Sequence, residues 1–79
     1  MEIKKLNAQM IGKNVRRIRK ELNETQEKFA EGIGVCKDTV SNIERGEVIP
    51  SAQVLANMSI NAKISINLIL GIDVPEVKK

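Results

Sequence analysis

Apolar residues near the N-terminus recur with helical spacing. Four aliphatic residues follow one another at intervals of four, three and four positions: Ile11, Val15, Ile18 and Leu22. Such residues lie on one stripe of an α-helix, so we predict an amphipathic helix over about residues 7–22. The basic residues Arg16, Arg17 and Lys20 then lie on the opposite, exposed face.

Two short helices joined by a tight turn are predicted next. Thr25 is a suitable N-cap for a helix over residues 26–33. Gly34 is suited to end it, because the left-handed conformation costs glycine no Cβ clash. Only two residues separate Gly34 from a third helical stretch, from Lys37 to about Arg45. Helices joined by so short a turn must cross steeply.

The C-terminal part of the chain predicts two further helices. After a loop that ends at Pro50, Ser51 is suited to cap a fourth helix. Ser65 is suited to cap a short fifth helix, which Gly71 ends. Apolar and polar residues do not alternate as they do in β-strands, so the pattern predicts an all-α fold.

The length of 79 residues corresponds to one domain, since compact domains contain about 50 to 200 residues. We expect a single domain over residues 1–79, with a helical core over 7–70 and a flexible C-terminal tail over 71–79. The content of 42% hydrophobic and 29% charged residues is typical of a chain that folds.

The composition excludes several kinds of site. Without histidine, the chain has no His-based acid–base catalysis and no His-containing metal site. Its one cysteine, Cys36, excludes an internal disulfide and a multi-cysteine metal site, and it fits a reducing, cytoplasmic setting. No nucleophile adjoins a base and no glycine-rich phosphate loop is present, so we expect no catalytic residue, enzyme activity, cofactor or small-molecule ligand. No apolar run approaches the about 20 residues that cross a bilayer, so no membrane contact is expected.

Charge is distributed unevenly along the chain. Residues 1–20 contain seven Lys or Arg and one Glu, a net charge of +6, whereas residues 21–79 contain six basic and nine acidic residues, a net charge of −3. One face could therefore meet an anionic partner. The alternative is that these side chains are only the solvated faces of helices.

A longer motif lies in the middle of the sequence. It consists of Gln26-Glu27-Lys28-Phe29-Ala30-Glu31-Gly32-Ile33-Gly34-Val35, then Val40, Ile43, Glu44-Arg45-Gly46 and Pro50. This motif resembles the helix-turn-helix of Cro/C1-type (XRE family) DNA-binding proteins, and the resemblance extends from about Ile11 to Leu70. It implies a five-helix, lambda-repressor-like fold, in which the second and third helices form the helix-turn-helix, and a function in binding double-stranded DNA.

The third helix of such a protein enters the major groove. Five of its residues are not needed for packing and are candidates for reading bases: Lys37, Asp38, Thr39, Ser41 and Asn42. Lys37 is suited to guanine O6 and N7, and Asn42 to a bidentate contact with adenine. Asp38 is suited either to cytosine N4 or only to the positive end of the helix dipole. Phosphate contacts are expected from Gln26 and Arg45.

Three further residues are interpreted through the resemblance. Arg19 and Glu44 stand where related proteins place a partly buried ion pair between the first and third helices; the alternative is that both are solvated charges. Cys36 stands where a Ser or Thr commonly caps the third helix, so we expect a weak cap. Its thiol is either a tolerated small residue or, at a helix N-terminus, a redox-sensitive group that could switch DNA binding.

The C-terminal segment is rich in aliphatic residues. Ile64, Ile66, Leu68, Ile69 and Leu70 exceed what one face of a short helix can bury in so small a domain. We therefore predict a dimer interface formed by Ile66, Leu68 and Ile69, unless all five residues close the monomer core. A homodimer would fit a repressor that binds a palindromic operator. The alternative function is a protein-binding module, such as an antitoxin or an anti-regulator.

Overall fold

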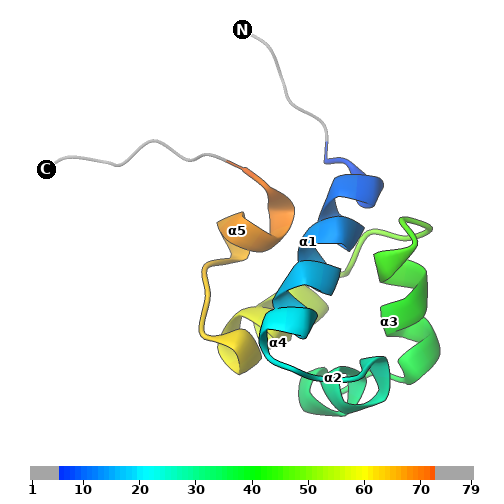
Figure 1. Cartoon of the computed structure of the whole chain (residues 1–79). Helices are drawn as coiled ribbons and strands as arrows, with labels where there is room; N and C mark the ends of the chain where they lie inside the picture. The colour runs from blue at the N-terminus through cyan, green and yellow to red at the C-terminus, as the bar shows by residue number, and fades with distance from the viewer. Residues whose placement is uncertain (1–5, 73–79) are drawn as a thin grey trace, which may run out of the picture.

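The computed structural model describes residues 6–72, in which helices are the sole regular elements (Figure 1). Five helices follow one another along the chain: α1 (Ala8–Glu21), α2 (Gln26–Ile33), α3 (Lys37–Glu44), α4 (Ala52–Ala62) and α5 (Ile66–Leu70). The predicted all-α, five-helix fold is confirmed, and the predicted ends of the first three helices are correct to within one residue. Residues 73–79 of the predicted tail lie outside the described residues.

Side chains at the helix N-termini explain why the helices begin where they do. Asn7 Oδ1 accepts hydrogen bonds from the backbone N–H groups of Gln9 and Met10 at the start of α1. Thr25, Ser51 and Ser65 cap α2, α4 and α5 in the same manner. Cys36 makes no such bond at the start of α3, so the weak cap expected from the sequence is confirmed.

One core joins all five helices. Ten hydrophobic residues have at most 9% of their surface exposed: Ile11, Val15, Phe29, Ala30, Ile33, Val40, Ile43, Leu55, Met58 and Ile69. Ile18 packs against this core. Leu22, the last residue of the predicted stripe, is the C-cap of α1 and is partly exposed.

The C-terminal aliphatic residues are buried more completely than the sequence predicts. Ile69 has no exposed surface, and Ile64, Ile66 and Leu70 pack against the core. The assignment of Ile69 to a dimer interface is therefore wrong, because a side chain inside the monomer contacts no second chain. The physical reason is that α5 packs against both α1 and α4, which gives it two buried sides. Only Leu68 of this group is largely exposed, at 58%.

Helix α1 lies between α5 and α3 and packs against both (Figure 1). On one side, Gly12 lies against α3 so closely that a Cβ at this position would overlap the backbone carbonyl oxygen of Ile43. On the other side, Asn14 Nδ2 donates to the carbonyl oxygen of Ile69 in α5 at 3.1 Å. The first contact sets how closely α3 approaches α1, and the second ties α5 to α1.

Over residues 6–72, no helix combines the length and the apolarity needed to cross a membrane.

Candidate nucleic-acid interface

Helices α2 and α3 are joined by a turn that the sequence specifies locally. Gly34 ends α2 in the left-handed conformation, with φ 76°. The backbone N–H of Val35 then donates to the carbonyl oxygen of Ala30 at 3.0 Å, which closes the turn. Ala30 is 2% exposed, so this small side chain lies within the core, and α2 packs against α3. The result is a helix-turn-helix with one side of α3 free.

The free side of α3 contains the five residues predicted to read bases. Val40 and Ile43 are buried and seat the helix on the core. Lys37 and Asp38 are exposed at its first turn, and the remaining three are half-buried: Thr39, Ser41 and Asn42. The structure therefore brings all five onto one helix, with the two charged residues at its N-terminal end.

Arg45, the C-cap of α3, contacts one of these candidates. Its Nη2 donates to Asn42 Oδ1 at 2.6 Å and to Glu47 Oε2 at 3.3 Å. Arg45 and Glu47 remain largely exposed, at 61% and 56% of their side-chain surface. The expected phosphate contact and one expected base contact are therefore linked by a hydrogen bond.

Arg19 and Glu44 form an ion pair between α1 and α3. Arg19 Nε donates to Glu44 Oε2 at 2.7 Å and Nη2 donates to Oε1 at 3.1 Å, which makes the pair bidentate. The side chains are only 12% and 4% exposed. Glu44 accepts these hydrogen bonds and raises the pKa of the Arg19 guanidinium further above its ordinary value, so the pair remains charged.

The first residue of α2 joins the same network. Gln26 Nε2 donates to Glu44 Oε1 at 3.2 Å. The amide nitrogen carries two hydrogens, so one is left to donate to a phosphate. Arg19 also reaches the loop before α2, where Nη1 donates to the carbonyl oxygen of Glu24 at 2.8 Å. The start of α2, the end of α3 and the middle of α1 are thereby held together.

Cys36 lies exposed immediately before α3. Its Sγ is 3.3 Å from Thr39 Oγ1. This hydrogen bond, together with the backbone N–H groups of Thr39 and Asp38, lowers the pKa of the Cys36 thiol.

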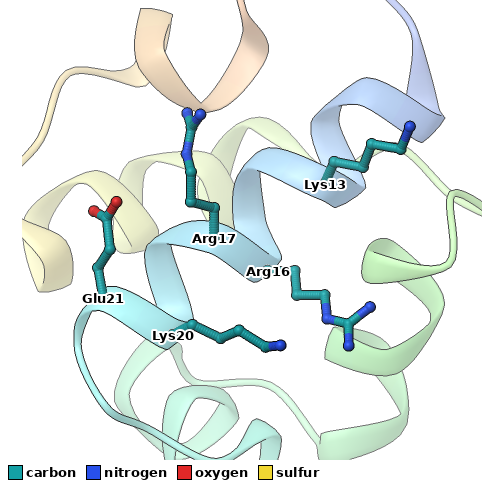
Figure 2. A pocket seen from close by; sticks show the side chains of 5 residues that line it. All are labelled: Lys13, Arg16, Arg17, Lys20 and Glu21. Atoms are coloured by element: carbon teal, nitrogen blue, oxygen red, sulfur yellow. The ribbon is translucent and has the colours of Figure 1, made fainter.

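The outward face of α1 is basic. Lys13, Arg16, Arg17 and Lys20 line a shallow depression that ends at Glu21 (Figure 2). None of the four forms an ion pair with a residue in the range 6–72. Figure 2 shows Arg16 extending toward α3 and Arg17 toward α5. The side of this face that adjoins α3 is therefore continuous with the helix-turn-helix.

Two features of the site were missed by sequence reasoning. The close approach of α1 to α3 at Gly12 has a sequence signal, because a glycine inside a helical pattern is unfavourable relative to alanine and indicates a packing constraint. The hydrogen bond from Arg45 to Asn42 has a weaker signal, the spacing of three residues that brings side chains together on a helix.

A family model described as helix-turn-helix matches residues 15–69. The chain belongs to this family. This match confirms the resemblance to Cro/C1-type helix-turn-helix proteins that residues 26–50 carry, together with the lambda-repressor-like fold expected from it. None of the curated proteins matches the sequence.

Several solved structures share the fold and part of the sequence. The P22 c2 repressor, solved with a synthetic operator, is 29% identical; the match covers 78% of this chain and 94% of that one, with a TM-score of 0.74. SinR, a master regulator of biofilm formation solved with DNA, is 35% identical over 77% of this chain and 98% of its own, with a TM-score of 0.72. ClgR from Corynebacterium glutamicum, a clp gene regulator, is 25% identical over 85% and 87%, with a TM-score of 0.73.

Proposed function

We propose that this chain is a sequence-specific, double-stranded DNA-binding regulator of transcription, and that it acts as a repressor. The observation that carries the proposal is the free polar side of α3, held on a helix-turn-helix by the Arg19–Glu44 ion pair. The relatives described above include two proteins solved with operator or with DNA. Their likeness supports the same class of ligand here.

The proposed complex places α3 in the major groove. Five side chains then face base edges: Lys37, Asp38, Thr39, Ser41 and Asn42. Arg45 and the second hydrogen of Gln26 Nε2 contact phosphates on either side of the groove. The part of the basic α1 face beside α3 adds attraction to the same backbone. No step in this function requires catalysis.

A selection experiment tests this function directly. Duplexes that the full chain retains from a random library should share one sequence, and binding to it should weaken steeply with salt. Each phosphate neutralised by Lys or Arg contributes a slope of about −0.9 to log K against log salt. If two chains bind one duplex, and each neutralises one phosphate through Arg45 and one through a cation of the α1 face, the four phosphates give a slope of about −4. Enrichment of no sequence, together with a flat salt response, would instead favour the protein-binding alternative.

We further propose that two chains bind a palindromic operator through α5. Leu68 is the exposed aliphatic residue of this helix, with Ile66 half-buried beside the core. A two-fold contact here would place two copies of α3 one duplex turn apart, about 34 Å.

Leu68→Lys tests the dimer. The variant should sediment as a monomer at concentrations where the wild type is dimeric, and its affinity for the selected duplex should fall toward that for random DNA. Ile60→Lys is the matched control, because Ile60 is 76% exposed and lies in α4 beside Gly32 and Asn61. If the wild type remains monomeric both free and on DNA, the palindromic operator is excluded with the dimer.

A further inference from the structure

The contact between Arg45 and Asn42 determines which end of the amide is held. A guanidinium only donates hydrogen bonds, so the Asn42 atom 2.6 Å from Arg45 Nη2 must be the carbonyl oxygen, Oδ1. The amide nitrogen, Nδ2, has no hydrogen-bond partner in the described part of the chain. Asn42 therefore presents its two N–H groups as the free end of the side chain.

The backbone after α3 turns sharply and brings Glu47 next to Arg45. Gly46 adopts the left-handed conformation, with φ 78°, and turns the chain back on the helix. The N–H of Glu47 then donates to the carbonyl oxygen of Asn42 at 3.0 Å. This brings the Glu47 carboxylate to 3.3 Å from Arg45 Nη2, on the guanidinium that also holds Asn42. A Cβ on Gly46 would lie 3.0 Å from Gln9 Cα, so the turn is packed against α1.

We propose that Arg45 is a positioning residue that sets the base preference of Asn42. A free asparagine reads adenine with both ends of its amide, accepting from N6 and donating to N7. Asn42 Oδ1 keeps a second lone pair, but the charged donor Arg45 Nη2 competes with adenine N6 for this oxygen. Both N–H groups of Nδ2 stay free, and they match a base with two acceptors in the major groove. Guanine, with O6 and N7, is that base. This inference rests on the proposed function and specifies one position of its target.

Parallel selections with four proteins test the inference. The position read by Asn42 is the one whose preference disappears in Asn42→Ala. At that position the wild type should favour guanine over adenine by roughly tenfold. Arg45→Met, which keeps a long side chain but cannot donate, should favour adenine by a similar factor. Glu47→Ala is the matched control: it removes the other acceptor of Arg45 but keeps the bond to Asn42, so guanine should remain preferred.

Each other outcome has a definite meaning. If Arg45→Met weakens binding to all duplexes and still selects guanine, Arg45 contacts phosphate only and the inference is wrong. The inference is also wrong if the wild type selects adenine, or if Asn42→Ala changes the base preference at no position. In both cases the proposal that the chain binds DNA would still stand. Failure of the wild type to enrich any sequence rejects the proposed function itself. Far-UV circular dichroism of each variant verifies that the helical content of the chain is unchanged.

Discussion

Replacing Glu44 by alanine should lower the free energy of unfolding by about 3–5 kcal/mol, because it leaves the Arg19 guanidinium charged and mostly buried without its partner. Gln26 and two nitrogens of Arg19 lose their acceptor at the same time. A chain of this length has a total stability of about 4–12 kcal/mol. The variant should therefore lose a large fraction of its stability, and at the lower end of this range it would be largely unfolded at room temperature.

Chemical denaturation followed by far-UV circular dichroism measures this loss, since the chain has neither Trp nor Tyr as a fluorescent probe. Glu47→Ala is the control, because it removes a carboxylate from an exposed pair with Arg45 and should change stability by less than about 1 kcal/mol. The double variant Arg19→Met, Glu44→Leu should recover much of the stability, because it removes both buried charges. If Glu44→Ala and Glu47→Ala lowered the free energy of unfolding equally, the burial of the Arg19–Glu44 pair would contribute nothing to stability.

The ion pair also explains why the site tolerates a weak cap on α3. The side chain of Cys36 makes no capping hydrogen bond at the start of the helix. Glu44, at the other end, ties α3 to α1 and to the start of α2. The C-terminal turn of α3 therefore ties the helix to its neighbours, while Lys37 and Asp38 in the N-terminal turn remain exposed.

The helices could be predicted because their determinants are local. Caps such as Thr25 and Ser51 act within one turn, and Gly34 and Gly71 end helices through their own backbone conformation. The spacing of Val40 and Ile43 was sufficient to place the predicted base-reading residues on the free side of α3. These features require no knowledge of distant segments.

Features that depend on distant contacts were predicted less well. Ile69 was assigned to a dimer interface because the sequence does not show that α5 packs between two other helices. The turn at Gly46, directly after Arg45, packs on Gln9, 37 residues earlier, which the sequence does not show either. The orientation of one amide decides which base a helix can read, and periodicity carries no information about that orientation.

Gly12→Ala should destabilise the domain by about 3 kcal/mol and abolish specific DNA binding. A Cβ at this position would overlap the carbonyl oxygen of Ile43 and lie 2.8 Å from that of Glu44. Both atoms belong to the backbone of α3, so the clash is relieved only by moving the whole helix away from α1. Overpacking alone costs about 1–3 kcal/mol, and the displacement also strains the buried ion pair.

Gly32→Ala provides a matched control on α2. It is the other glycine within a helix, and its nearest neighbours are the side-chain amide atoms of Asn61, from 3.0 Å, which can move aside. Alanine is favoured over glycine inside a helix by about 0.5–1 kcal/mol, so this variant should be as stable as the wild type or more so. Denaturation should therefore show that Gly12→Ala is less stable than the wild type and that Gly32→Ala is at least as stable. Only Gly12→Ala should lose affinity for the selected duplex. If Gly12→Ala retained both stability and affinity, the close approach of α1 would not be what positions α3, and the ion pair at Glu44 would have to do so alone.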